Sequence, residues 1–166
     1  MIRRFKTSHF LLTVSALTFI PVAFAVDTNE NLGFDIKISL SKKAAAKLQS
    51  TNTGITVMAS YYGNPRKSAR RRVNEIGLID LGLDTIDRSG GPGLVHITGN
   101  TIAAERLEWI QGPAKVNVNI LSSRKGDENN ILNCDFIDGD IAAIKESPVE
   151  LHCSLIEEDI ENKHKP

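Results

Sequence analysis

The most concentrated charge in the chain is a group of five basic residues within positions 66–72, shortly after a pair of tyrosines. A guanidinium group can bind a carboxylate or phosphate through two parallel hydrogen bonds, which the lysine ammonium cannot match. Several such groups on one loop create a local field that attracts an acidic protein face or another anion. We therefore predict a binding loop made by Arg66, Lys67, Arg70, Arg71 and Arg72. The alternative is a solvated loop that pairs with Glu75, Asp80 or the acidic tail.

The two tyrosines before this loop are the next candidates for a binding surface. Ile55, Val57, Ala59 and Tyr61 alternate with more polar residues, so Tyr61 and Tyr62 should face opposite sides of a strand. Tyr61 would pack inside, and Tyr62 would lie exposed beside the basic loop, where tyrosine is a common interface anchor. Ordinary packing of both rings is the alternative.

The chain has two cysteines, and each lies on the apolar phase of an alternating segment. Cys134 and Cys153 should therefore point into the core and form a structural disulfide. In the loop-entropy model, closing a loop of roughly 20 residues contributes about 3 kcal/mol. A redox or metal-binding pair would need a Cys-x-x-Cys spacing or clustered histidines, and neither occurs.

The remaining reactive side chains do not form a recognisable catalytic or metal motif. Ser122, Ser123 and Ser154 lack the Gly-x-Ser-x-Gly elbow of many hydrolases. The histidines are scattered over separate segments, at His96, His152 and His164. Three acidic residues lie near one turn, at Asp135, Asp138 and Asp140. They lack the spacing of an EF-hand calcium loop, so an Asp-Gly turn is the favoured interpretation. We predict no catalytic residue, no metal and no cofactor, with a small secreted hydrolase as the least favoured alternative.

The N-terminus has the pattern of a secretory signal peptide over residues 1–25. Arg3, Arg4 and Lys6 precede an uncharged segment, and Ala23-Phe24-Ala25 fits the small-x-small pattern of a cleavage site. The uncharged stretch is shorter than the roughly 20 residues that span a bilayer. We expect cleavage at Ala25, no stable membrane anchor afterwards, and a periplasmic or secreted product.

Removing this leader changes the overall charge. The leader carries three of the 20 basic residues and no acidic residue, so the mature chain has 17 basic residues against 20 acidic ones, a net charge of −3. A net acidic chain is atypical of a nucleic-acid binder. Only five aromatic residues remain after residue 25, which leaves little material for a sugar-stacking platform.

Period-two alternation is the dominant pattern in the mature chain. It predicts strands over 34–40, 55–62, 76–83, 94–98, 116–120, 132–136 and 149–155. In the third of these, Ile79, Leu81 and Leu83 would face inward, with Gly77 and Gly82 as possible bulge points. Ser41 can cap a short helix over 42–48, and residues 141–145 suggest a helical turn. Thr101 to Ile110 is ambiguous, and we favour a strand there.

These patterns predict a mainly β chain with a single domain over residues 32–156. Seven or eight short strands favour an antiparallel sandwich, of immunoglobulin-like or transthyretin-like architecture, or a small barrel, with one or two short helices. Residues 26–31 and the charged tail 157–166 should be flexible.

The predicted function is that of a non-catalytic binding protein of the cell envelope. Its partner would be another protein with an acidic face, engaged through the basic loop in the manner of an inhibitor or immunity protein. An envelope structural or surface-assembly subunit is the second hypothesis, in which sheet edges make the contacts.

Overall fold

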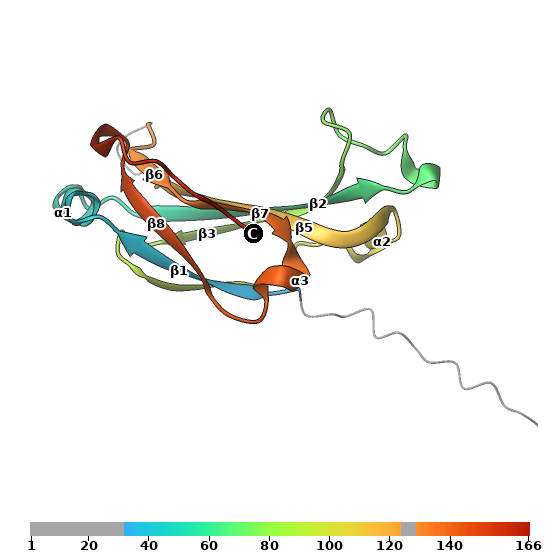
Figure 1. Cartoon of the computed structure of the whole chain (residues 1–166), viewed down its shortest axis with the longest axis horizontal. Coiled ribbons are helices and arrows are strands. Elements are labelled where there is room, and N and C mark those ends of the chain that lie inside the picture. Colours follow the sequence, from blue (N-terminus) through green and yellow to red (C-terminus); the bar gives the residue numbers. More distant parts are fainter. Residues whose placement is uncertain (1–31, 124–128) are drawn as a thin grey trace, which may run out of the picture.

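A computed structural model describes residues 32–123 and 129–166 (Figure 1). The predicted leader and the predicted flexible segment 26–31 lie outside these residues. Within them, no helix is both long enough and apolar enough to cross a membrane.

The described residues form two β-sheets packed face to face, with short helices at the ends (Figure 1). Sheet A contains, in spatial order, β4 (Gly93–Ile97), β1 (Phe34–Leu40), β8 (Val149–Leu155) and β6 (Leu132–Cys134). Sheet B contains β3 (Ile79–Arg88), β2 (Ile55–Pro65), β5 (Ile110–Ser122), β7 (Phe136–Asp140) and β9 (His164–Lys165). The helical segments are α1 (Lys42–Thr51), η1 (Lys67–Ala69), α2 (Ala104–Leu107), α3 (Ile141–Ile144) and η2 (Ile156–Glu158).

The core lies between the sheets and is built from the apolar phase of the alternating strands. In β1, Phe34, Ile36 and Ile38 are buried while the side chains between them face outward. The same holds in β2, where Tyr61 is buried and Tyr62 is only half-buried. The strand alternation read from the sequence is confirmed here, because a period of two places one face of each strand in the core.

The fold class is confirmed as a mainly β sandwich, and residues 32–123 and 129–166 form no closed barrel. The described part of the chain has nine strands rather than seven or eight, and three short α-helices rather than one or two. The sheets are also mixed rather than purely antiparallel. β1 pairs in parallel with β8, and β7 pairs in parallel with β9.

Helix α1 begins where the sequence predicts. The Ser41 hydroxyl accepts a hydrogen bond from the Ala44 amide at 3.0 Å, which satisfies one free N–H of the first turn. The Glu158 carboxylate in turn accepts from the same hydroxyl at 2.5 Å and from the Leu155 amide at 2.8 Å. The cap therefore also ties α1 to the end of β8. Ala44 and Leu48 supply the buried face of the helix.

The inward phase predicted for β3 is wrong beyond Leu81. Tyr61 pairs with Gly82 and Tyr62 with Asp80, so Leu81 is an extra residue opposite β2. Gly82 adopts φ +153°, which favours glycine. The bulge shifts the alternation by one residue, so Leu83 is 44% exposed and Asp84 turns inward.

The segment Thr101 to Ile110 is not the strand that we favoured. It contains the one-turn helix α2, and β5 begins only at Ile110. The Ala103 amide donates to the Leu81 carbonyl at 2.8 Å, so the segment lies along the edge of sheet B. The spacing of Ala103, Leu107 and Ile110 also fitted one face of a helix, which was the alternative interpretation.

The predicted single strand over 132–136 is divided at Asp135. Residues before it belong to sheet A and residues after it to sheet B, because the chain crosses between the sheets here. The crossing reverses the inward phase, so Ile137 is buried while Phe136 stacks on the His164 ring at 5.2 Å.

The tail predicted to be flexible is attached to the sandwich. Asp135, which is 6% exposed, accepts hydrogen bonds from the Lys163 amide at 2.6 Å and the His152 amide at 3.2 Å. Its carboxylate also lies 3.5 Å from the Lys165 ammonium, and the Phe136 amide donates to the Lys163 carbonyl at 3.0 Å. A charged composition predicted fraying, but one buried carboxylate and the free edge of β7 hold the segment.

Replacing Asp135 with alanine should release this tail. The Lys163 amide and the Lys165 ammonium would lose their acceptor, so trypsin should cut after Lys163 much faster than in the native protein. Mass spectrometry of the loss of the last three residues measures this. Asp138→Ala, an exposed substitution in the neighbouring strand, is the control. Equal cleavage of all three proteins would contradict the attachment.

Candidate binding site

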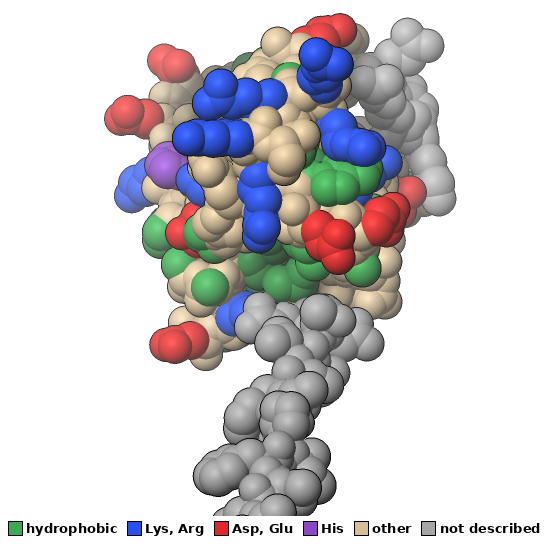
Figure 2. All heavy atoms as spheres, turned by 90° about the vertical axis from the view of Figure 1, so that its right-hand side faces the viewer, with side chains coloured by type: hydrophobic (Ala, Val, Ile, Leu, Met, Phe, Trp, Pro, Cys, Tyr) green, Lys and Arg blue, Asp and Glu red, His purple; other side chains and the backbone are tan. Residues whose placement is uncertain are grey.

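The basic loop, residues 66–72, leaves the sandwich where β2 ends. β2 pairs with β5 as far as Pro65 opposite Ile110, so the loop is placed at one end of sheet B and stands out from it (Figure 1). Figure 2 shows this end of the molecule. Basic side chains gather over its upper part, above hydrophobic side chains that are flanked by acidic ones.

The backbone of the loop is fixed by the start of β5. The Arg66 amide donates to the Trp109 carbonyl at 2.8 Å, and its Nε donates to the Ile110 carbonyl at 2.5 Å. The short η1 turn then buries Ala69, which is 3% exposed, and the Arg72 amide donates to the Ala69 carbonyl at 2.9 Å. The loop is thus held at both ends and in the middle.

Arg72 adds a contact between the loop and the sandwich. Its guanidinium carbon lies 4.3 Å from the centre of the Trp109 ring. This stacking is a cation–π interaction, typically about 0.5–1 kcal/mol at an exposed site. It orients Arg72 without neutralising its charge. The half-buried Trp109 therefore serves as a platform for one of the five cations.

The five basic side chains are exposed and are not neutralised by the carboxylates proposed as their partners. Among residues 32–123 and 129–166, none of the five lies within 4.0 Å of an acidic oxygen. Asp80 pairs with Arg106 at 3.5 Å instead. The acidic tail lies at the far edge of sheet B, beyond β7. The loop therefore presents its positive charge to solvent.

The Tyr62 hydroxyl is bonded to a carboxylate of sheet B. It donates to the Asp138 carboxylate, across β5 on the outer face of sheet B. Burial and this hydrogen bond raise the pKa of Tyr62 to about 12. The contact directs the ring across the sheet rather than along β2 toward the loop. The sequence alternation predicted that Tyr62 faces outward, but it did not predict that Asp138, two strands away, is its hydrogen-bond partner.

A groove of about 640 Å³ adjoins the basic loop. Leu107, Ile110 and Ile141 contribute apolar surface to it, while Arg66 and Lys145 contribute positive charge. Glu105 of α2 and Glu108, which directly follows α2, also line the groove. The sequence patterns did not identify either residue. No pattern in the sequence indicates this groove, because β5, α2 and α3 form it together.

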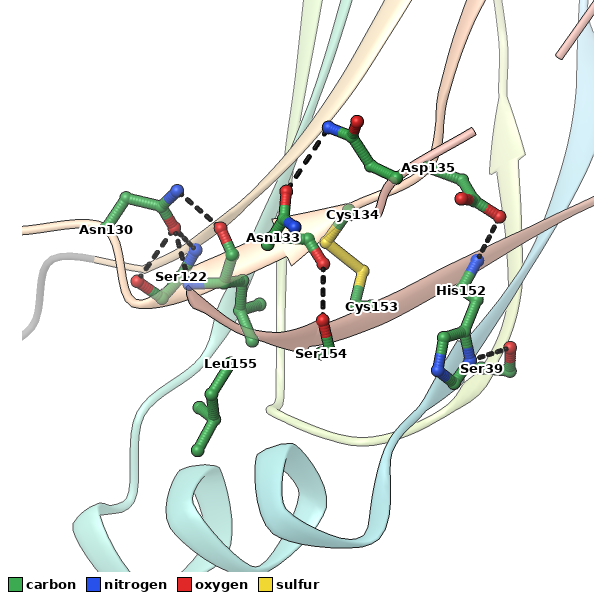
Figure 3. The surroundings of a disulfide bond; sticks show 12 residues. Ser39, Ser122, Asn130, Asn133, Cys134, Asp135, His152, Cys153, Ser154 and Leu155 are labelled. Carbon is green, nitrogen blue, oxygen red and sulfur yellow. Dashed lines mark hydrogen bonds between the residues drawn. A yellow bond between two sulfur atoms is a disulfide. The ribbon is translucent and has the colours of Figure 1, made fainter. Parts of the chain in front are cut away.

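Several side chains of the kinds used in hydrolase catalysis have structural partners. The Ser122 hydroxyl accepts from the Ile131 amide at 3.0 Å, and the Ser154 hydroxyl donates to the Asn133 carbonyl at 3.3 Å (Figure 3). His152 contacts the Ser39 hydroxyl at 3.0 Å. In the part of the chain that the structure describes, no group of three metal-ligating side chains is found.

The predicted disulfide is present. Cys134 of β6 and Cys153 of β8 lie directly opposite each other in sheet A and are joined by an S–S bond (Figure 3). Both residues face the core, and Cys153 is fully buried. The bond links the edge strand β6 to its neighbour β8. A disulfide is compatible with an oxidising compartment.

Asp84 is a buried carboxylate that sequence reasoning missed. It accepts hydrogen bonds from the Thr101 hydroxyl at 2.6 Å, the Gly99 amide at 2.9 Å and the Tyr61 hydroxyl at 3.0 Å. Burial alone would raise the pKa of the Asp84 carboxyl, but these hydrogen bonds outweigh it and lower that pKa below its ordinary value of 3.8. Burial next to Asp84 raises the pKa of Tyr61 far above its usual range. With all its donors supplied by the fold, Asp84 is structural rather than catalytic.

Comparisons with protein-family models, with curated proteins and with solved structures find no significant match to this chain.

Proposed function

We propose that this protein is an exported, non-catalytic binding protein of the cell envelope. It engages another protein through the basic loop, in the manner of an inhibitor or immunity protein. The partner presents carboxylates to the guanidinium groups of the loop. The predicted leader and the disulfide between Cys134 and Cys153 support the compartment.

One observation carries the proposal: hydrogen bonds hold the loop to the sandwich, and its cations have no acidic partner among the described residues. Arg66 and Ala69 fix the backbone, while Arg70 and Arg71 are exposed and have no acidic partner among the described residues. Like charges held close together repel one another, so the loop has an electrostatic cost that a bound anion would remove. A fixed loop also loses little conformational entropy on binding.

Reversing the charge of the loop should abolish partner capture. We expect Arg70→Glu, Arg71→Glu and Arg72→Glu together to prevent retention of the partner from envelope extract, because the substituted loop repels an acidic face. The measurement is a pull-down with the mature protein, followed by mass spectrometry of the proteins retained.

Helix α1 provides a matched control for this experiment. Lys42, Lys43 and Lys47 are exposed and lie outside the loop, so reversing all three changes the net charge by the same amount. The control protein should retain the partner as the native protein does. If both triple variants capture the partner equally well, the loop is not the binding surface.

A further inference from the structure

The loop that joins β2 to β3 presents an exposed apolar side chain a few residues after the basic ones. Ile76 is 78% exposed, the highest value among the large hydrophobic side chains of the described residues. It follows Arg72 by four positions and belongs to the same excursion from the sandwich (Figure 1). A single exposed isoleucine is ordinary on a protein surface. Its significance depends on how firmly it is held and on what surrounds it.

The turn over residues 74–78, here called the apex turn, fixes Ile76 in this position. The Asn74 side-chain oxygen accepts from the Ile76 amide at 3.2 Å and from the Leu78 amide at 3.0 Å. The Asn74 amide donates to the Leu78 carbonyl at 2.8 Å, and the Gly77 amide donates to the Asn74 carbonyl at 3.0 Å. Gly77 adopts φ +84°, a conformation that suits glycine.

The base of the apex turn is anchored in the sandwich. Leu78 and Val73 are half-buried, and Ile79 is buried at the start of β3. Ile76 therefore cannot fold back into the core without breaking the turn. The side chain is held outward, four residues after Arg72 in the same loop.

We propose that the apex turn and the basic loop together bind an acidic segment of another protein in which apolar side chains stand between the carboxylates. The carboxylates bind the guanidinium groups of Arg70 and Arg71, and an apolar side chain of the segment packs on Ile76. This inference rests on the proposed function, and it specifies the chemistry of the partner. A pure polyanion would satisfy the charge but would leave Ile76 in water.

An anionic membrane is the competing occupant of such a surface, since basic loops with apolar tips also bind lipid headgroups. The acidic residues near the loop disfavour it. Glu75 lies beside Ile76 in the apex turn, and the exposed Glu105 and Glu108 line the same groove as Arg66. A continuous negative surface would meet these carboxylates, whereas a protein segment can avoid them.

Two short labelled peptides test this inference by fluorescence anisotropy at low ionic strength. One alternates glutamate with leucine and the other alternates glutamate with serine, so they differ only in apolar side chains. The native protein should bind the leucine peptide about tenfold more tightly, which is the ratio expected for burying one partly exposed apolar contact. Ile76→Ser should remove that preference and leave the affinity for the serine peptide unchanged.

Leu94→Ser is the matched control, because Leu94 is 60% exposed on β4 of sheet A and lies outside the loop. It should keep the full preference for leucine. Equal binding of both peptides, lost in the triple arginine variant, would overturn the apolar contact while leaving the proposed function intact. If the native protein binds neither peptide, the inference that the loop recognises an acidic segment is wrong. The pull-down with the triple arginine variant would still test the proposed function separately.

Vesicles of phosphatidylglycerol and phosphatidylcholine are the third probe. The native protein and Ile76→Ser should sediment with them to the same small extent. Strong sedimentation that Ile76→Ser abolishes would identify a membrane as the occupant and overturn the inference.

Discussion

Replacing Cys134 and Cys153 together with alanine is expected to lower the free energy of unfolding by at least about 3 kcal/mol. The bond joins residues separated by 19 positions, and in the loop-entropy model a closed loop of that length restricts the unfolded chain by about this amount. Both side chains face the core, so the loss of sulfur packing adds to the effect. Urea unfolding of the two proteins measures the difference as a change in midpoint.

Reduction of the native protein is the control that separates the stabilisation by the S–S bond from the stabilisation by packing of the two sulfur atoms. Dithiothreitol breaks the S–S bond but leaves both sulfur atoms in the core, so the reduced protein should fall between the native and the doubly substituted one. If reduction leaves the unfolding midpoint unchanged, the disulfide does not stabilise the sandwich.

Asp84→Ala is expected to destabilise the domain by a similar amount, about 3 kcal/mol. The substitution leaves the Gly99 amide and the Tyr61 hydroxyl without an acceptor in the interior, and each unpaired buried donor costs about 1–3 kcal/mol. Asp87→Ala is the matched control, because Asp87 lies on the same strand but faces outward. It should cost under about 1 kcal/mol. Equal losses for both variants would contradict the role given to Asp84.

The contribution of Asp84 also predicts a pH dependence. Because the pKa of Asp84 is lower in the folded protein than its ordinary value of 3.8, the fold favours the deprotonated carboxylate. This stabilisation is complete above pH 3.8 and is lost as the pH falls through the lower, folded pKa. The native protein should therefore lose stability in acid more steeply than Asp84→Ala does. Parallel curves in urea unfolding at a series of acidic pH values would refute the assignment.

Much of the sandwich was predictable from alternation, and the failures have specific physical causes. The inward residues of β1 and β2 followed from a period of two, because the faces of these strands differ in exposure. In β3, the bulge before Gly82 shifts the alternation by one residue. The sequence indicates that Gly82 is a possible bulge point, but it does not show which neighbouring strand the bulge faces. The chain crossing at Asp135 reverses the phase in the same way.

The candidate site was predicted only as a cluster of charge. The sequence places the five cations on one loop, since proximity along the chain brings them together. It does not indicate that Arg66 is bonded to the start of β5 or that Arg72 stacks on Trp109, because those partners lie about 40 residues away. The attachment of the tail to Asp135 depends on similar long-range contacts.

Photo-crosslinking from the basic loop tests most directly whether this loop binds the partner. A photoreactive residue at Ser68, exposed between the basic residues, should form an adduct with one envelope protein, and the triple arginine variant should abolish it. The same residue at Ser50, exposed on α1, should give no such adduct. An adduct that forms equally from both positions, or only from position 50, would contradict the claim that the basic loop binds the partner.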